Sequence, residues 1–151
     1  MTIHCIGIGG IGISAIGRYY RAKGHDVSGS DVAENEITQD LAKLRVNIAI
    51  GLHKAANLPE NVDMVIYSPA VKEDNPEFKE AESRGVKLLS YPEALGELTK
   101  QHTTIAISGT HGKSTTTAMV ALVLIKAGLN PTVIIGTKLK EFSNSNFRMG
   151  G

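Results

Sequence analysis

The chain has a single cysteine and no tryptophan, and it carries no excess of charge of one sign. With only Cys5 present, an internal disulfide and a cysteine-based zinc cluster are both excluded. Sixteen lysines and arginines against fifteen aspartates and glutamates give a net charge of +1, so no broad basic field favours nucleic acid or an anionic membrane. We therefore expect neither nucleic acid nor a membrane as a partner.

Long hydrophobic runs are also missing. The longest, from Ala118 to Ile125, has eight residues, whereas about 20 are needed to cross a bilayer. No basic, apolar and small-residue signal peptide opens the sequence. Apolar residues make up 42% and charged residues 21% of the 151 residues, which is typical of a globular domain with a buried core. A cytoplasmic, globular protein is the expectation.

Short apolar runs alternate with helical patterns along the first hundred residues. This alternation predicts an α/β fold with a parallel, doubly wound sheet of the Rossmann type. Cys5 falls inside the first strand and is expected in the core. The expected strands cover residues 3–8, 26–30, 46–50, 62–67 and 86–89, and the expected helices cover 11–23, 34–45, 76–84 and 92–100.

A second unit is expected in residues 101–151. An apolar strand at 103–108 precedes a glycine-rich turn, a strongly apolar helix at 113–127 and a strand that starts at Val133. These elements are too few to close a domain, because a parallel sheet needs cover on both faces. Either they add to the first sheet, or this unit opens a second domain. The polar stretch 138–149 is expected to be a disordered end, with a substrate-covering loop as the alternative.

The first expected strand runs into a glycine-rich turn and then a helix. Gly7, Gly9 and Gly12 form the pattern G-x-G-x-x-G in the strand–turn–helix context that binds a diphosphate. Gly7 permits the tight turn, Gly9 lets the backbone approach an anion, and Gly12 allows close packing of helix and strand. The helix N-terminus adds free N–H groups and partial positive charge. The expected ligand contacts are Gly9, Gly10, Ile11 and Gly12.

An acidic residue stands where a ribose would lie. Asp31 lies nineteen residues beyond Gly12, at the end of the second expected strand. An acid at this place hydrogen-bonds a ribose hydroxyl in dinucleotide sites. The pattern fits NAD, FAD or a nucleoside-diphosphate sugar, and by itself it favours NAD. A turn that packs tightly and binds nothing is the alternative.

A second glycine-rich turn runs from Gly109 to Thr115 and ends in Gly-Lys-Ser, as a P-loop does. In such a loop the backbone N–H groups hold phosphates, Lys113 reaches the outer phosphates, and the Ser114 hydroxyl ligates Mg²⁺. The general pattern has glycine where this chain has Ile107. Two phosphate-binding turns exclude a simple dehydrogenase. They indicate ATP at one turn and a nucleotide-linked substrate at the other.

The second turn, Gly109-Thr110-His111-Gly112-Lys113-Ser114-Thr115, resembles the ATP loop of the Mur ligases, the amide-forming enzymes of peptidoglycan precursor synthesis. The family often has threonine where this chain has Ser114, and both residues supply the hydroxyl. Further segments resemble the family in order along the whole chain. They are Gly7–Ile16, Ser28–Asp31, Gly51–His53, Ser68–Val71, Asp74–Glu77 and Ala127–Thr132.

The resemblance implies a three-domain enzyme, of which this chain has the first domain and the start of the second. Residues 1–100 would be the Rossmann-like domain that holds a UDP-sugar, and residues 101–151 the start of the P-loop ATPase domain. The branch that it resembles joins L-alanine to UDP-N-acetylmuramate through an acyl phosphate, with ATP and Mg²⁺ as cofactors. A recycling branch that adds a tripeptide is one alternative, and an NAD-binding redox domain is another.

The resemblance also implies roles for individual residues. Lys113 would be the catalytic residue that stabilises the transferred phosphoryl group, and Ser114 would ligate the metal. His53 and Ser68, each close after an expected strand, join Asp31 and the first turn as contacts of the UDP-sugar. Nucleotide contacts are expected at Gly109, Thr110, His111, Gly112, Lys113, Ser114 and Thr115.

The missing parts of such an enzyme set two further expectations. The other Mg²⁺ ligands and the amino-acid domain have no counterpart in this chain, so it is expected to bind the UDP-sugar without turnover. The apolar helix 114–127 would lack a sheet to cover it, and it is therefore expected to pack on a neighbouring chain.

Overall fold

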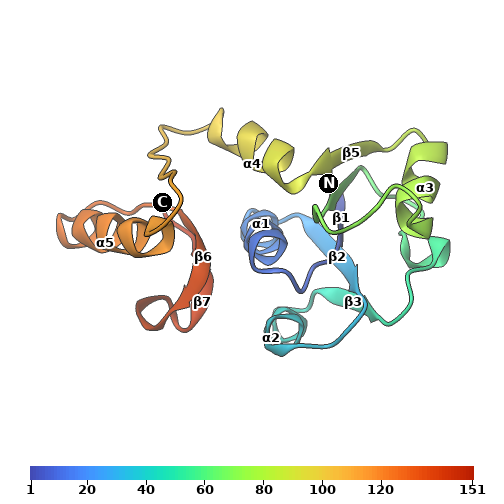
Figure 1. The fold of residues 1–151 in the computed structure, drawn as a ribbon, viewed down its shortest axis with the longest axis horizontal. Coiled ribbons are helices and arrows are strands. Elements are labelled where there is room, and N and C mark those ends of the chain that lie inside the picture. The colour runs from blue at the N-terminus through green and yellow to red at the C-terminus, as the bar shows by residue number, and fades with distance from the viewer.

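The computed structural model describes residues 1–151 and contains a five-stranded parallel sheet followed by a smaller unit (Figure 1). The sheet has the strand order β3-β2-β1-β4-β5, and every neighbouring pair is parallel. This order confirms the predicted Rossmann-like α/β class. The strands are β1 (Thr2–Ile6), β2 (Asp26–Asp31), β3 (Asn47–Ile50), β4 (Met64–Tyr67) and β5 (Lys87–Ser90).

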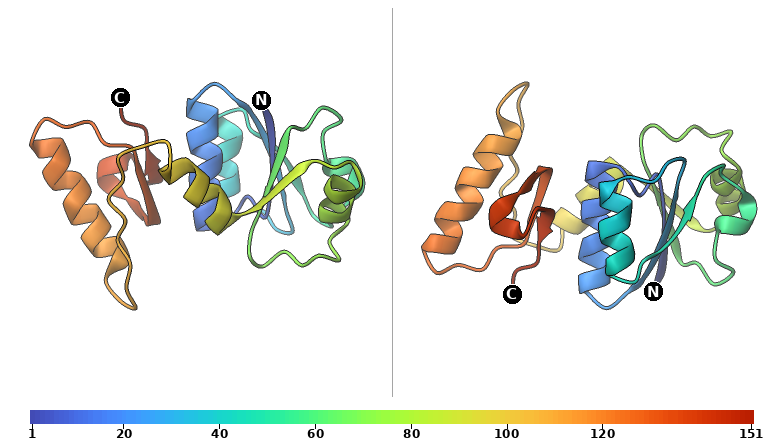
Figure 2. Two further views of the ribbon diagram at one scale, coloured as in Figure 1. Left: turned by 90° about the horizontal axis from the view of Figure 1, so that it is seen from above. Right: turned by 90° about the horizontal axis from the view of Figure 1, so that it is seen from below.

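Helices cover both faces of this sheet. One face carries α1 (Ile11–Ala22), α2 (Glu36–Lys43) and α4 (Tyr91–Thr99), and the other carries α3 (Pro76–Ser83) and the short 3₁₀ helix η1 (Ala55–Asn57) (Figure 2). None of the helices in the chain has both the length and the apolar composition that a membrane crossing would require.

The period-2 geometry of the strands separates the core into two clusters. On β1, Ile3 and Cys5 face α1, whereas Ile6 faces α3; each of the three is fully buried. The Cys5 thiol is free, and burial raises its pKa to about 12. The expected core position of Cys5 is thus confirmed.

The start of α3 is explained by the chemistry of its first residues. The side-chain oxygen of Asn75 accepts hydrogen bonds from the backbone N–H groups of Glu77 at 2.8 Å and Phe78 at 3.2 Å, and Pro76 is the first helical residue. An asparagine N-cap accepts hydrogen bonds from backbone N–H groups of the first turn that have no partner inside the helix. Proline suits the first helical position because an N–H group there would have no helical partner. This short segment therefore fixes where α3 begins and which way Glu77 enters the fold.

The second unit consists of one helix and a β-hairpin, and it does not add to the first sheet. Its elements are α5 (Lys113–Lys126), β6 (Val133–Leu139), the 3₁₀ helix η2 (Lys140–Phe142) and β7 (Ser145–Arg148). Strands β6 and β7 pair antiparallel, and Ala121 of α5 is buried against Val133 and Ile135 of β6 and Phe142 of η2. The apolar helix is therefore covered on one side, while Met119 and Val123 are 63% and 65% exposed.

The strand predicted at residues 103–108 is wrong. These residues have no regular secondary structure, and Ile105 is 63% exposed. A strand forms only when a neighbouring strand pairs with its N–H and C=O groups. No strand of either sheet pairs with this segment, so its apolar sequence does not suffice.

The disordered end predicted for residues 138–149 is also wrong. Strand β6 runs to Leu139, β7 follows, and the hairpin lies beside α1 (Figure 2). The Asn146 side chain is buried and donates to the backbone oxygen of Ile11 and, at 2.9 Å, to the Ser14 hydroxyl. Lys138 forms an ion pair with Glu36 of α2 at 3.0 Å. The polar residues of this stretch thus have partners in the first unit.

Candidate functional site

A cleft of about 770 Å³ opens at the carboxyl ends of the parallel strands. It lies where the strand order reverses, with β2 on one side of β1 and β4 on the other. Open α/β sheets bind ligands at this edge, and the volume suits a small molecule. The lining includes Gly7, Gly9, Gly10, Asp31, Asn35, Leu52, His53, Ser68, Lys72, Asp74 and Asn75.

Gly9 lies directly against Asp31, the acidic residue at the end of β2. A Cβ atom at Gly9 would be 2.7 Å from both the Asp31 Oδ2 and the Asn35 Nδ2 atoms, so only glycine fits without displacing them. The Gly9 backbone N–H donates to Asp31 Oδ2 at 2.8 Å, and the Asn35 amide donates to the Gly9 oxygen at 3.2 Å. The first turn and Asp31 therefore form one hydrogen-bonded edge of the cleft.

The beginning of α1 has the features of an anion-binding helix end. Gly10 is its N-cap residue, no side chain caps the helix, and its first turn contains no acidic residue. Ile11 and Gly12 do not line the cleft. A Cβ at Gly12 would be 2.8 Å from the ring of Tyr91, so this glycine permits a close approach to α4. The predicted reason, packing against a strand, is a helix-to-helix contact instead.

His53 and Ser68 both line the cleft, and the strands that precede them, β3 and β4, lie on opposite sides of β1. Ser68 follows β4, and a Cβ at Gly7 would lie 3.0 Å from the Ser68 Cβ. His53 follows β3, and its side chain is 16% exposed. The structure thus brings five predicted substrate contacts into one cleft: Gly9, Gly10, Asp31, His53 and Ser68.

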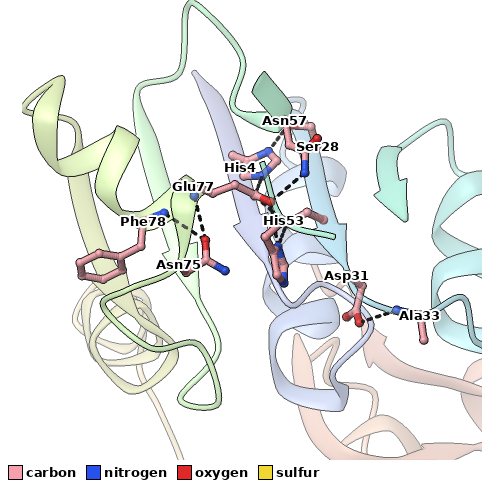
Figure 3. Close-up of polar contacts among 10 residues, drawn as sticks. His4, Ser28, Asp31, Ala33, His53, Asn57, Asn75, Glu77 and Phe78 are labelled. Carbon is pink, nitrogen blue, oxygen red and sulfur yellow. Dashed lines mark hydrogen bonds and ion pairs between the residues drawn. The ribbon is translucent and has the colours of Figure 1, made fainter. Parts of the chain in front are cut away.

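A buried polar cluster behind the cleft was not predicted from the sequence (Figure 3). At its centre is the Glu77 carboxylate, which has no solvent exposure. Its Oε1 atom contacts His53 Nδ1 at 2.8 Å and Asn57 Nδ2 at 2.9 Å. Its Oε2 atom contacts His4 Nε2 at 2.8 Å and the Ser30 hydroxyl at 2.6 Å.

These contacts determine the charge state of the cluster. Burial by itself raises the pKa of Glu77, but the hydrogen bonds from His4, Ser30, Asn57 and His53 outweigh it and hold the pKa at about 2. Glu77 is therefore an ionised carboxylate at neutral pH. The sequence signal was the Asn75-Pro76 helix start, which locates Glu77 but says nothing of its burial.

The second glycine-rich turn is an exposed loop before α5. Gly112 is the N-cap residue of α5 with φ of +75°, a conformation that glycine adopts without strain. No side chain caps this helix, and its first turn contains no acidic residue. The Lys113 ammonium donates to the Gly109 oxygen at 2.6 Å and so folds back over the loop.

The predicted nucleotide contacts lie together in this loop, and all of them are exposed except the partly buried Ser114. A Cβ at Gly136 of β6 would lie 3.3 Å from the Ser114 hydroxyl oxygen, so the hairpin touches the start of α5. No group of three or more His, Cys, Asp or Glu residues in the chain is placed to hold a metal ion. The uncapped helix end fits a phosphate group, and the Ser114 hydroxyl lies in the first turn of that helix, where the sequence places the Mg²⁺ ligand.

The parallel sheet and its cleft at the strand reversal define an α/β protein of the Rossmann-like class. The family model described as "Mur ligase family, catalytic domain" matches residues 2–103. The chain belongs to the Mur ligase family.

Individual relatives agree with this assignment. UDP-N-acetylmuramate–L-alanine ligase of Campylobacter jejuni is 50% identical over 144 residues, which is 95% of this chain and 32% of the relative. The enzyme of the same name from Aquifex aeolicus is 48% identical over 147 residues, 97% of this chain and 32% of the relative. The chain thus spans about a third of the length of these curated relatives.

Solved structures give the same result. The UDP-N-acetylmuramate-alanine ligase of Thermotoga maritima superposes with a TM-score of 0.93 at 39% identity, over 99% of this chain and 35% of that one. A murein peptide ligase from Psychrobacter arcticus superposes with a TM-score of 0.89 at 30% identity, over 100% of this chain and 34% of that one. These relatives do not favour a redox function.

Proposed function

We propose that this chain is the UDP-sugar-binding part of a ligase that joins L-alanine to UDP-N-acetylmuramate. The names of the relatives at 50% and 48% identity support this substrate pair. The single observation that carries the proposal is the cleft edge formed by Gly9 and Asp31, since it combines an uncapped helix end with a fixed carboxylate. In the complete reaction ATP phosphorylates the sugar's carboxylate, and the amine of L-alanine then displaces phosphate.

In this proposal different cleft residues contact different parts of the UDP-sugar. The backbone of Gly9 and Gly10, with the start of α1, faces the diphosphate. Asp31 accepts a hydrogen bond from a ribose hydroxyl. His53 and Ser68 contact the remainder of the UDP-sugar. Ile11 and Gly12 do not line the cleft. In this proposal they act only as the first residues of α1, whose N-terminal end faces the diphosphate.

The second loop would hold ATP in the same proposal. Residues Gly109 to Thr115 would surround the phosphates, with Lys113 placed to stabilise charge on the transferred phosphoryl group. Ser114 would supply one ligand to Mg²⁺, and phosphate oxygens of ATP and water molecules would supply others. We infer that residues 1–100 form the UDP-sugar domain and 101–151 begin the ATPase domain. The chain by itself then binds the sugar nucleotide without turnover.

The recycling ligase is the second candidate. The murein peptide ligase from Psychrobacter arcticus is 30% identical to this chain, compared with 39% for the Thermotoga maritima enzyme, and this difference favours L-alanine as the added group.

A cytoplasmic location follows from the proposed use of ATP and a UDP-sugar. The exposed side chains Met119 and Val123 of α5 would meet a second chain.

A thermal-shift comparison with UDP, UDP-N-acetylmuramate, NAD and Mg·ATP tests the cleft assignment. A ligand at one hundred times its Kd adds about 2.7 kcal/mol of stability, which raises Tm by roughly 5–11 °C. We expect this shift with both UDP compounds and none with NAD. A shift with NAD alone would return the chain to the redox class.

The matched control for this experiment comes from the same strand. Asp31→Asn weakens the ribose contact, whereas Asp26→Asn changes an exposed aspartate at the other end of β2. The UDP shift should shrink only in Asp31→Asn. Equal shifts in the two variants would exclude Asp31 from the site.

A further inference from the structure

The Glu77 carboxylate is saturated with hydrogen bonds. Its two oxygens together accept four, from His53 and Asn57 on one side and from His4 and Ser30 on the other. A carboxylate has about four lone-pair positions. Glu77 therefore has no free position for a ligand, and its side chain is fully buried. Any influence of Glu77 on the cleft must pass through a neighbour.

His53 is the one of these four neighbours that lines the cleft. Its Nδ1 atom lies 2.8 Å from Glu77 Oε1. Because an ionised carboxylate only accepts hydrogen bonds, Nδ1 must carry the proton of this contact. In the neutral imidazole the other nitrogen, Nε2, then has a free lone pair. It is the ring nitrogen that remains for a ligand.

His4 holds the opposite side of the carboxylate in place. Its Nε2 atom donates to Glu77 Oε2 at 2.8 Å, and its Nδ1 atom lies 2.8 Å from the Ser28 hydroxyl. His4 is 1% exposed and comes from the central strand β1. The carboxylate is thus anchored to the sheet, and His53 on the loop after β3 is oriented by that anchor (Figure 3).

We propose that Glu77 is a positioning residue that holds His53 as the Nδ1–H tautomer, so that Nε2 accepts a hydrogen bond from a hydroxyl or N–H group of the ligand. This inference rests on the proposed UDP-sugar function. It identifies the partner of His53 as a donor group of the sugar or the base, because a lone pair at Nε2 repels a phosphate oxygen. The side chain of free histidine favours the other tautomer, Nε2–H, so the preference for Nδ1–H must come from the contact with Glu77.

The tautomer can be measured directly. Long-range ¹H–¹⁵N correlation spectra of the ¹⁵N-labelled chain at alkaline pH distinguish a protonated ring nitrogen from a free one. We expect Nδ1–H for His53 and Nε2–H for His4. The two histidines that donate to the Glu77 carboxylate would then be different tautomers. An Nε2–H or doubly protonated His53 in the wild-type chain would overturn the proposal, whether or not any variant folds.

Glu77→Gln tests the effect on the ligand. The amide keeps the shape but has one accepting oxygen, so it cannot hold both histidines. We expect His53 to shift towards the Nε2–H tautomer and UDP or UDP-N-acetylmuramate affinity, measured by calorimetry, to fall about five- to tenfold, as for one lost hydrogen bond. In a His53→Ala background the same change should cause no further loss of affinity.

Ser28→Ala is the matched control. It removes the hydrogen-bond partner of His4 without touching His53, so stability falls while the His53 tautomer and the UDP affinity stay within about twofold of wild type. If Ser28→Ala lost as much UDP affinity as Glu77→Gln, the effect of Glu77 would be explained by stability of the fold, and the positioning role would be refuted. If the wild-type chain binds no UDP compound, the proposed function fails. If it binds one and Glu77→Gln binds it equally well, only the positioning role fails.

Discussion

The Asn146 side-chain amide donates a hydrogen bond to the Ser14 hydroxyl at 2.9 Å, although 132 residues separate the two along the chain. Asn146 belongs to β7 and Ser14 to the first turns of α1, immediately after the glycine-rich turn at the cleft. Both side chains are buried. This contact attaches the hairpin of the second unit to the helix whose start faces the proposed diphosphate.

Removing this contact should destabilise the chain. Asn146→Ala leaves the buried Ser14 hydroxyl without its donor, and we expect a loss of about 1–3 kcal/mol in the free energy of unfolding, measured with urea. Asn61→Ala, at an exposed position, should change it by less than about 0.5 kcal/mol. Equal effects of the two variants would show that the hairpin is not held by Asn146.

Acid should remove the stability that Glu77 supplies. Its pKa is about 2 in the folded chain and 4.5 in an unperturbed glutamate. Because the folded-state value is the lower one, the contribution is complete above about pH 4.5 and disappears as the pH falls towards 2. It amounts to at most roughly 3 kcal/mol. Denaturation at a series of pH values should show a weaker dependence in this window for Glu77→Gln, whereas the exposed control Glu60→Gln should follow wild type.

A methyl group at Gly9 should block the cleft and leave the fold intact. The atoms it would meet, Asp31 Oδ2 and Asn35 Nδ2, are at the ends of side chains and can move away. We expect Gly9→Ala to weaken UDP binding by more than about tenfold, because the backbone can no longer approach a diphosphate. Gly96→Ala is the glycine control, since no atom lies within 4 Å of its added Cβ. It should bind UDP normally and gain about 0.5–1 kcal/mol of stability.

The role of Lys113 is best tested in a ligase of full family length that contains this segment. Lys113→Ala should lower the rate of ATP-dependent amide formation by about 10²–10³-fold, as expected when a charge-stabilising group is lost. Lys126→Ala, at the other end of α5, should retain the wild-type rate. ATP turnover by Lys113→Ala at the wild-type rate would refute the assignment of the second loop.

The exposed side of α5 should promote association. Met119 and Val123 lie four residues apart, on one side of the helix, and each is more than 60% exposed. We expect sedimentation to reveal dimers or larger species of the chain, and Met119→Lys with Val123→Lys to restore the monomer. Thr117→Lys, on a less apolar part of the same helix, should leave association unchanged. A monomeric wild-type chain would contradict this prediction.

Local sequence patterns were enough to predict the strands and helices of the first sheet and the two glycine-rich turns. The Asn75-Pro76 start of α3, the alternation of strand and helix, and the glycine pattern after β1 each depend on neighbours along the chain, and the structure has these elements within a few residues of the predicted bounds. Gly9, Asp31, His53 and Ser68 could also be placed at one sheet edge, because the carboxyl ends of parallel strands meet there.

Tertiary structure decided those features that depend on contacts between residues far apart in the sequence. The apolar segment 103–108 is not a strand because no strand pairs with it, and the polar segment 138–149 is ordered because α1 and α2 bind it. Glu77 is a buried anion only because His4, Ser30, His53 and Asn57 converge on it from four other segments. The sequence by itself thus determined the alternating strands and helices of the first sheet and the two glycine-rich turns, whereas the pairing, burial and charge state of the other residues followed from which residues the fold brings together.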